Sequence, residues 1–397
     1  MGRRLIFFTG VYDTLDLFTE QLVKAFKRMG YETLQIDTTD MGKGLVALAG
    51  FVSSPVTAAI TFNNLAFHLE VVPGKNIWEE LQIPCINILV DHPSLYQKAL
   101  ESVPSNAIVL CIDRKHMGYL QRFYPNISTI GFLPHGGKLS GQKLIPIGER
   151  EIDVLYAGGL SRKYVAGIMP DFSQFAFHAK AVADQAYERM ITDTDLTIEE
   201  AVEQALLQQG VSITDEQLSD FISKIHYIEM LAVSYYREKL IRTLLCHGVR
   251  VHLYGQGWDI CDFVNHPNLI WAGMVSPQEV IVKMQHSKFV LNTTTWFKDG
   301  AHERVFNGML AGAVAVTDET IYLREEFQGY DAVGADKAEL IMFSLKEMDR
   351  LAETLSDLLK HPDKMQQIAD NGREKAKLRH TWECRAKELY EGLLVNL

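Results

Sequence analysis

The chain has 397 residues, of which 47% are hydrophobic and 22% are charged, and its formal net charge is −11. A chain of this length exceeds what one hydrophobic core usually serves, so two domains are expected. The negative charge excludes sequence-independent binding to nucleic acid, which needs a cationic surface. It still permits a local basic pocket for a phosphorylated small molecule. The cysteines are scattered without metal-ligand spacing, which favours free thiols in a reducing cytosol.

The first apolar run is too short for a secretory signal or a membrane span. It covers residues 5–8, between Arg4 and Thr9, whereas a spanning helix needs about 20 apolar residues. The other apolar runs have the length of strands. We therefore expect a soluble, cytoplasmic protein without an integral membrane segment.

The first third of the chain alternates predicted strands with helix-length segments. Strands are expected at 4–10, 32–36, 57–62, 85–90, 107–111 and 128–132, with a helix at 15–29. Strands separated by helices imply βαβ units and a parallel sheet. Ligands of such sheets bind at the carboxyl ends of the strands.

Two of these strand ends supply candidate catalytic residues. Asp91-His92-Pro93 follows the strand 85–90, and Pro134-His135-Gly136-Gly137 follows the strand 128–132. Asp91 is a candidate general base or acceptor for a sugar hydroxyl, and His135 supplies a second imidazole. The alternative is that Asp91 caps the next turn and that His92 is solvated.

A linker is expected at 141–151, followed by a second α/β region. Its strands are predicted at 152–157, 249–254, 268–271, 289–294 and 311–318, and its last helices at about 336–360, 362–377 and 381–395. Residues 171–247 show helical periodicity and no strand signal, so an insertion of three or four helices is expected there. Asp193-Thr194-Asp195 has the spacing of a metal-binding carboxylate pair, but it follows no strand and is expected to serve as a cap. No metal site is predicted.

Residues 299–307 form the strongest candidate site. Asp299-Gly300-Ala301-His302-Glu303-Arg304-Val305-Phe306-Asn307 opens a predicted helix, after a polar loop and the predicted strand 289–294, in which Asn292 is a further candidate contact to the donor. Gly300 lets backbone approach a ligand, and free N–H groups at Ala301, His302 and the helix start bind a diphosphate. Arg304 is suited to neutralise phosphate, and Glu303 or Asn307 to hold sugar or ribose hydroxyls. The alternative is an Asp-capped helix with solvated polar residues.

Two glycine turns offer weaker candidates. Gly158-Gly159 with Arg162-Lys163 is typical of a phosphate loop between a strand and a helix, although it matches no established fingerprint. Its alternative is a tight turn with two solvated cations. Tyr254-Gly255-Gln256-Gly257-Trp258 would let a nucleotide approach beside Tyr254 or Trp258. Equally, Gly255 and Gly257 simply turn the chain and Trp258 is a core or rim aromatic.

The order of segments from Tyr156 to Asp318 resembles the carboxyl-terminal domain of GT-B glycosyltransferases. The run from His302 to Asp318 resembles the CgeB-like, spore-maturation-protein-like branch of family 1 glycosyltransferases. This resemblance implies an α/β fold of two Rossmann-like, doubly wound domains facing a cleft. The acceptor domain would cover 1–145, and the nucleotide-sugar domain 146–380 with the insertion at 171–247. A last helix, 381–397, would cross back to the first domain.

The resemblance also implies a function: a metal-independent hexosyltransferase that moves a sugar from a nucleoside-diphosphate sugar to an unknown protein, glycan or small-molecule acceptor. The donor is expected to be a UDP-sugar, with no further cofactor and with retention of configuration, the leaving phosphate assisting deprotonation of the acceptor. If the enzyme inverts instead, Asp91 or His135 is the expected base.

Individual positions carry the resemblance. Gly273-Met274-Val275 matches the loop that reads the base, and Gly300 to Arg304 matches the diphosphate-binding helix start. Asp299 stands where retaining relatives have a glutamate near the donor sugar, and Asn307 where many have a ribose-binding glutamate. Gly159 stands where relatives often have a phosphate-binding arginine, which leaves that role to Arg162 or Lys163.

Two other functions are compatible with these residues. A nucleotide-sugar epimerase on the same fold would need acid and base carboxylates flanking the sugar. A non-catalytic scaffold would bind the nucleotide sugar and dock a partner, or a second copy of the chain, through the helices of 171–247.

Overall fold

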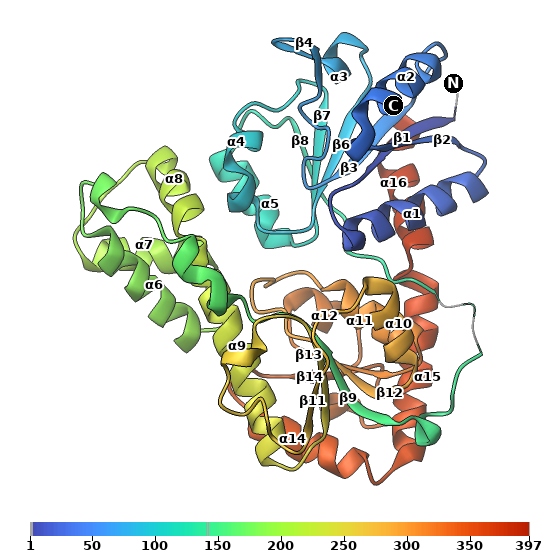
Figure 1. The fold of residues 1–397 in the computed structure, drawn as a ribbon, viewed down its shortest axis with the longest axis vertical. Coiled ribbons are helices and arrows are strands. Elements are labelled where there is room, and N and C mark those ends of the chain that lie inside the picture. The colour runs from blue at the N-terminus through green and yellow to red at the C-terminus, as the bar shows by residue number, and fades with distance from the viewer. Residues whose placement is uncertain (1–2, 140, 142, 397) are drawn as a thin grey trace. The chain divides into compact units, whose positions relative to one another are not determined.

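The computed structural model describes residues 3–139, 141 and 143–396. Met1 and Gly2, which precede the first apolar run, and Gln142 in the expected linker lie outside the described residues. The chain divides into two compact units: Met1–Lys138 with Leu378–Leu397, and Leu139–Lys377. Figure 1 shows the parallel sheet at the centre of each unit.

The first unit is built on a six-stranded sheet of order β2-β1-β3-β6-β7-β8, in which all neighbouring pairs are parallel. Its strands are β1 (Arg4–Thr9), β2 (Glu32–Asp37), β3 (Ala58–Phe62), β6 (Cys85–Leu89), β7 (Ala107–Cys111) and β8 (Thr129–Phe132). The predicted strand runs are therefore confirmed. An antiparallel pair, β4 (Glu70–Val72) and β5 (Lys75–Asn76), was not predicted, because strands this short leave no periodicity to detect.

The helices of the first unit are α1 (Asp13–Arg28), α2 (Met41–Phe51), α3 (Ile77–Glu80), α4 (Gln97–Leu100), α5 (Arg114–Phe123) and the last helix, α16 (Trp382–Gly392). The last helix lies against α1, where Trp382 packs on Phe18 with ring centroids 4.8 Å apart. Arg385 of α16 donates from Nε to the carbonyl of His135 at 2.9 Å. The C-terminal helix is thus part of the core of the first unit.

The second unit contains a six-stranded sheet of order β11-β10-β9-β12-β13-β14, in which all neighbouring pairs are again parallel. Its strands are β9 (Ile152–Ala157), β10 (Val251–Tyr254), β11 (Leu269–Trp271), β12 (Ser287–Leu291), β13 (Val314–Asp318) and β14 (Ile341–Phe343). Counted along the chain, this is the order 3-2-1-4-5-6 of a doubly wound Rossmann sheet. The central strands are buried on both faces, which explains their continuous apolar runs.

Helices cover both faces of this sheet. The helices of the unit are α6 (Ala179–Thr192), α7 (Ile198–Gln208), α8 (Asp215–Ile225), α9 (Tyr227–Cys246), α10 (Pro277–Gln285), α11 (Glu303–Leu310), α12 (Ile321–Glu326), α13 (Tyr330–Val333), α14 (Met348–Leu358) and α15 (Pro362–Arg379). One face packs on α9, α14 and α15, and the other on α10 and the end of α11. The expected insertion of three or four helices corresponds to α6–α9.

The prediction of one helix over 336–360 is wrong in its first half. Residues 341–343 form the edge strand β14, and α14 begins only at Met348. The apolar run Leu340–Phe343 is short, and a short apolar run does not distinguish a strand from a helix. These residues form a strand because they pair with β13, where Thr317 lies opposite Met342.

No helix within the described ranges 3–139 and 143–396 combines the length and the apolar character that crossing a membrane requires.

Candidate functional site

The strand order of the second unit reverses between β9 and β12, and this is where open α/β sheets bind ligands. Gly158-Gly159 follows β9, and Asn292-Thr293-Thr294 follows β12. The two strand ends are joined by a hydrogen bond of 3.1 Å between the Tyr156 hydroxyl and Thr293 Oγ1. The sequence therefore brings a glycine turn and a polar turn together at the switch point.

Arg304 reaches this point from the first turn of α11. Its Nη1 donates to Asn292 Oδ1 at 3.0 Å, and its Nη2 lies 3.0 Å from His302 Nε2. His302 is also the N-cap residue of the helix, with its Nδ1 3.3 Å from the Arg304 backbone nitrogen. A neutral imidazole accepts at only one of its two nitrogens, so it accepts either from this backbone N–H or from the guanidinium. Burial, and then the charge of Arg304, lower the pKa of His302. A neutral imidazole is therefore available as an acceptor beside the guanidinium.

A second guanidinium, that of Arg237, comes from α9 in the helical insertion. Arg237 is only 5% exposed, and its Nη1 donates to the carbonyl of Gly159 at 2.6 Å. Its guanidinium lies over the ring of Trp296, 5.5 Å from the centroid. Its Nε is buried without a hydrogen-bond partner among the described residues. The sequence analysis did not identify Arg237.

The two guanidiniums repel one another, and no carboxylate forms an ion pair with either of them among the described residues. Burial is the largest cause that lowers the pKa of Arg237, and the charge of Arg304 lowers it further. Among the described residues, neither arginine forms an ion pair with Asp or Glu. Burying charge without a partner is costly. The switch point is therefore suited to an anion.

Asp318, at the end of β13, is the acidic side chain whose charge raises the pKa of Arg237. Its Oδ1 accepts from the Thr294 backbone N–H at 2.6 Å, so one of its oxygens is occupied in holding the β12 turn. Burial raises the pKa of Asp318 to about 6, against the opposing effect of the Thr294 hydrogen bond.

The predicted diphosphate turn lies directly before α11. The N-cap is His302, so the alternative of an Asp299 cap is wrong. Gly300 and Ala301 are buried, and the Gly300 carbonyl accepts from the Thr320 hydroxyl at 2.7 Å. Asp299 and Glu303 are half-buried, and Glu303 contacts the His302 imidazole. Asn307 lies one turn further along α11 and is buried.

The two cations predicted for the Gly158-Gly159 turn already have partners. Both lie in a 3₁₀ segment, Ser161–Gly167. Arg162 Nη2 pairs with Glu238 at 2.8 Å, and Lys163 Nζ pairs with Asp259 at 2.6 Å. Both residues are exposed, so the structure agrees with the alternative of a turn with two solvated cations, each of which also has an acidic partner. The guanidinium that contacts Gly159 is instead that of Arg237.

The second glycine turn packs against the first. A Cβ at Gly255 would meet the Gly158 carbonyl, and one at Gly257 would meet the Leu160 carbonyl. Trp258 is fully buried and donates from Nε1 to the Gly158 carbonyl at 2.8 Å. The structure thus gives these glycines a close approach of backbone to backbone, and it makes Trp258 a core aromatic.

The neighbouring residues of β10 and β11 differ in their exposure. Tyr254 is buried, and its carbonyl accepts from Gly158 N–H at 2.8 Å. Gly273 has a positive φ of 72°, which turns the chain after β11. Met274 follows it with 67% of its surface exposed, so this loop presents backbone and one flexible side chain to solvent.

In the first unit, the two imidazoles predicted at strand ends are buried. His135 is 3% exposed and packs against Phe18 and Trp382, at 5.3 and 6.4 Å between ring centroids. His92 is 6% exposed, and its Nδ1 lies 2.8 Å from the Ser94 hydroxyl. The alternative of a solvated His92 is therefore wrong.

Asp91, by contrast, is half-buried and held by two side chains. Asn63 Nδ2 and the Tyr96 hydroxyl each donate to its Oδ2 at 2.8 Å. Asp91 is therefore oriented by its neighbours. The expected cap is instead supplied by His92, whose Nδ1 accepts from Ser94 N–H at 3.2 Å.

The Asp-x-Asp sequence of the insertion forms a local turn. Asp193 ends α6, and its Oδ1 accepts from the Asp195 backbone N–H at 3.1 Å. Within the described parts of the chain, no group of three or more His, Cys, Asp or Glu side chains is arranged to hold a metal ion.

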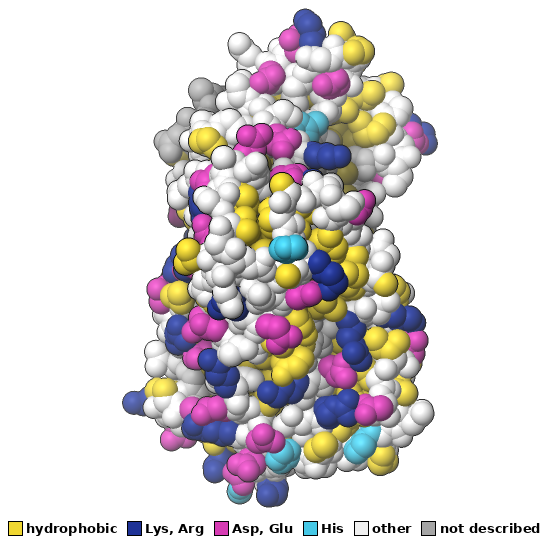
Figure 2. Space-filling view, turned by 90° about the vertical axis from the view of Figure 1, so that its left-hand side faces the viewer, with side chains coloured by type: hydrophobic (Ala, Val, Ile, Leu, Met, Phe, Trp, Pro, Cys, Tyr) yellow, Lys and Arg dark blue, Asp and Glu magenta, His cyan; other side chains and the backbone are white. Residues whose placement is uncertain are grey.

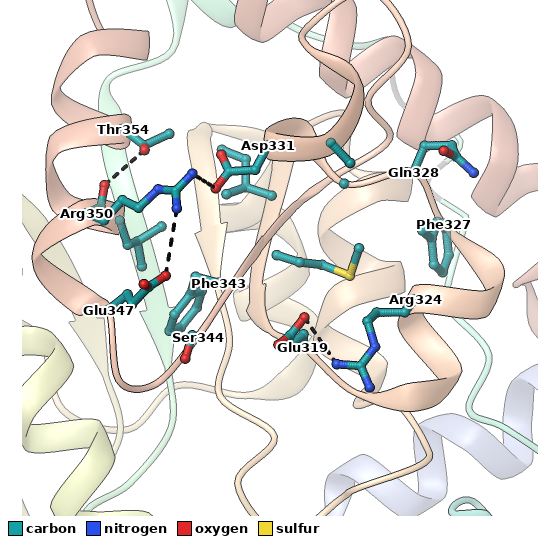
Figure 3. A pocket seen from close by; sticks show the side chains of 15 residues that line it. Glu319, Arg324, Phe327, Gln328, Asp331, Phe343, Ser344, Glu347, Arg350 and Thr354 are labelled. Atoms are coloured by element: carbon teal, nitrogen blue, oxygen red, sulfur yellow. Dashed lines mark hydrogen bonds and ion pairs between the residues drawn. The ribbon is translucent and has the colours of Figure 1, made fainter. Parts of the chain in front are cut away.

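A separate hollow of about 420 Å³ lies beside the edge strand β14. Figure 3 shows Arg324 and Arg350 on its walls with Glu319, Asp331 and Glu347. Arg350 pairs with Asp331 at 2.9 Å, and Arg324 pairs with Glu319 at 3.2 Å. These pairs are largely exposed, and exposed pairs of opposite charge contribute little stability. None of the residues at the β9–β12 switch point lines this hollow.

Comparison with known proteins places a glycosyltransferase-like domain in the second part of the chain. Residues 237–391 match the family model described as "Glycosyl transferase-like". The match begins at Arg237 and includes Asn292, Arg304 and Asp318. No curated protein sequence is significantly similar to the chain.

Solved structures show the same fold over the whole chain. Sucrose-phosphate synthase from Thermosynechococcus elongatus has 10% sequence identity and a TM-score of 0.55, and the match covers 100% of each chain. An alpha-glucosyltransferase in complex with UDP and a 13-mer DNA has 11% identity and a TM-score of 0.58, also with 100% coverage of each chain.

HepE from Anabaena, in complex with UDP and glucose, is similar at 12% identity and a TM-score of 0.52, covering 98% of this chain and 99% of that one. The chain therefore has the GT-B fold of two Rossmann-like domains with parallel sheets. The CgeB-like branch remains a prediction from the sequence.

Proposed function

We propose that the protein is a glycosyltransferase that moves a sugar from a UDP-sugar to a hydroxyl group of an acceptor. The observation that carries this proposal is the pair of guanidiniums, Arg237 and Arg304, at the β9–β12 switch point without a carboxylate partner. The glycosyltransferase-like match over 237–391 and the UDP bound in two similar structures support the choice of donor.

The diphosphate is the part of the donor that this site suits best. Arg237 and Arg304 come from different helices, so together they provide donors from two directions. Guanidinium groups bind phosphate oxygens through parallel hydrogen bonds, which suits them to this ligand. A bound diphosphate would supply the negative charge that the buried Arg237 lacks. The buried charge of Arg237 would accordingly have a less favourable electrostatic free energy in the free protein than in the complex.

The same charges assist the reaction. Cleavage of the bond between the anomeric carbon and the β-phosphate oxygen leaves negative charge on the departing UDP. Arg237 and Arg304 are held in place before the reaction by Gly159 and Asn292, so they stabilise that charge without reorganising. We propose that these two cations replace a metal ion in this role.

The remaining roles follow from position. Asn307 and Glu303 on α11 are assigned to ribose or sugar hydroxyls, and the exposed loop at Met274 to the base. Asp299, in the turn before α11, is assigned to the donor sugar. We propose transfer with retention, in which a phosphate oxygen of the leaving UDP takes the proton of the acceptor hydroxyl.

Titration calorimetry with UDP, uridine and other nucleoside diphosphates tests the donor site. We expect UDP to bind and uridine to bind far more weakly, because uridine lacks the group that the arginines recognise. Release of UDP from UDP-glucose is then measured with and without a panel of hydroxyl acceptors. Failure of every nucleoside diphosphate to bind would overturn the proposal. Binding without turnover on any acceptor would favour the scaffold alternative.

A further inference from the structure

The loop between β12 and α11 carries two adjacent aromatic residues beside the donor-site arginines. The guanidinium of Arg237 lies over the ring of Trp296, 5.5 Å from its centroid. Phe297 packs against the imidazole of His302, with ring centroids 6.1 Å apart. That imidazole lies 3.0 Å from Arg304, between Nε2 and Nη2. One short loop therefore contacts Arg237 directly and Arg304 through His302.

The two ends of this loop are fixed by hydrogen bonds. Thr294 N–H donates to Asp318 Oδ1 at 2.6 Å. Lys298 Nζ donates to the Thr194 carbonyl at 2.6 Å, and the Lys298 carbonyl accepts from Ile321 N–H at 3.1 Å. The loop is thus tied to the end of β13, to the helical insertion and to the start of α12. Its aromatic residues are held at defined positions as a result.

The two aromatic residues differ in burial. Phe297 is 4% exposed and anchors the loop. Trp296 is half-buried, and its ring lies 6.1 Å from that of Phe297, at an interplanar angle of 80°. The indole N–H of Trp296 forms no hydrogen bond within the described residues. Trp296 is therefore held by ring contacts, and one of these is with Arg237.

Arg237 depends on this contact for its orientation. Within the described ranges its guanidinium has one hydrogen bond, from Nη1 to the Gly159 carbonyl at 2.6 Å, and one aromatic partner, Trp296. Its Nε is buried without a hydrogen-bond partner in the same ranges. A single hydrogen bond fixes one nitrogen and leaves the plane of the group free to turn about it. The face of an indole attracts a guanidinium and so restricts that plane.

The orientation of Arg237 matters because an acidic chain attracts anions poorly at long range. The net charge is −11. On the face of the molecule in Figure 2, Lys and Arg side chains are interspersed with Asp and Glu. Binding of a phosphate through two parallel hydrogen bonds requires the plane of the guanidinium to face the phosphate oxygens. Affinity for a diphosphate therefore depends on how accurately the two arginines are placed before the ligand arrives.

We propose that Trp296 is a positioning residue of the donor site, whose ring sets the plane of the Arg237 guanidinium for the diphosphate. This inference rests on the proposed function, because the ligand that it concerns is the nucleoside-diphosphate donor. Phe297 and Lys298 hold the loop in which Trp296 lies. Removing the ring should weaken UDP binding, although the protein loses neither a hydrogen bond nor a charge.

Calorimetry with UDP on the full chain compares two substitutions of Trp296. Trp296→Leu removes the ring, and we expect the Kd for UDP to rise about fivefold to thirtyfold, the range for one cation–aromatic contact. Trp296→Phe keeps a ring face, so its Kd should stay within about threefold of the parent value. Trp296→Met also lacks the ring but fills more of its space, and it replaces Trp296→Leu if circular dichroism shows that variant to be unfolded.

The NMR signal of the Arg237 Nε–H tests the orientation itself, without nucleotide. In protein labelled with ¹⁵N-arginine, it is assigned as the signal that Arg237→Met lacks. An aromatic ring shifts the resonance of a proton that lies over its face. Trp296→Leu should therefore move this signal, and Trp296→Phe should move it much less.

Tyr164→Leu is the matched control, because Tyr164 is an exposed aromatic residue of the same unit with the Lys163 ammonium 5.9 Å from its ring centroid. It should change neither UDP binding nor the Arg237 signal. Parent-like UDP binding by Trp296→Leu, an equal loss in Trp296→Phe, or an unmoved Arg237 signal in Trp296→Leu would overturn the assignment. If the parent protein binds no nucleoside diphosphate, the proposed function fails, and the NMR comparison alone decides whether Trp296 orients Arg237.

Discussion

Replacing Arg237 by Met separates binding from folding at the donor site. The thioether side chain retains the apolar contact with Trp296 and removes the buried charge. It also removes the hydrogen bond to the Gly159 carbonyl, which then has to be solvated. The variant therefore tests whether the charge of Arg237 serves a ligand or the fold.

The expected loss of UDP affinity is large. Removing one partner of a buried pair of charges costs about 2–5 kcal/mol. That corresponds to a rise in Kd of about 30-fold to several thousand-fold. Without ligand, the balance is reversed, because replacing poorly compensated buried charge by an apolar group is often neutral or stabilising. The Tm of the unliganded variant should therefore stay the same or rise.

Differential scanning fluorimetry with and without UDP measures both effects, and calorimetry gives the Kd. Arg162→Met is the matched control, since Arg162 is a nearby cation of the same turn whose charge is paired with Glu238. It should bind UDP as the parent protein does. Normal UDP binding by Arg237→Met would refute the reasoning. So would a variant series in which Arg162→Met, and not Arg237→Met, loses UDP.

Three further outcomes are expected. Arg304→Ala should abolish sugar transfer with an unchanged far-ultraviolet spectrum; retained transfer would contradict its role. Glu229 is buried with its pKa raised to about 8, so the folded state binds more protons than the unfolded state from about pH 4.5 to 8 and loses stability as pH rises. Glu229→Gln should therefore gain Tm over the parent at pH 8.5 but not at pH 5, unlike the exposed Glu216→Gln. Gly255→Ala should unfold at lower urea concentration than Gly273→Ala, which has open space around its Cβ and meets only the left-handed cost of about 1–2 kcal/mol.

The sequence predicted the central strands of both sheets well because these strands are buried on both faces. Runs such as 85–90 and 152–157 contain hardly any polar residue, and their turns begin with glycine or aspartate. These signals are local, so they can be read from one chain. The edge strand β14 is an exception, because its pairing with β13 depends on residues that are distant in sequence.

The site was predicted where it depends on neighbours in the chain. Arg304 and His302 belong to one helix start, and their contact is between residues two apart. Arg237 was missed for the opposite reason: its bond to Gly159 spans 78 positions, and in sequence it is one cation in a regular helix. The roles of Gly255 and Gly257 were undecided, because a glycine that admits a ligand and one that admits backbone look alike in sequence.

The position of Arg237 indicates that the helical insertion contributes to the donor site. If α6–α9 served only to dock a partner, no residue of α9 would need to bury its charge at the end of β9. Yet α9 packs on the sheet through Leu240 and Leu244 and carries Arg237 to the Gly159 carbonyl one turn earlier. Lys298, in the turn before α11, donates to the carbonyl of Thr194 between α6 and α7 at 2.6 Å, so the other helices are tied to the same region. The insertion is therefore part of the structure that holds the donor-binding arginines, and its loss would remove one of them.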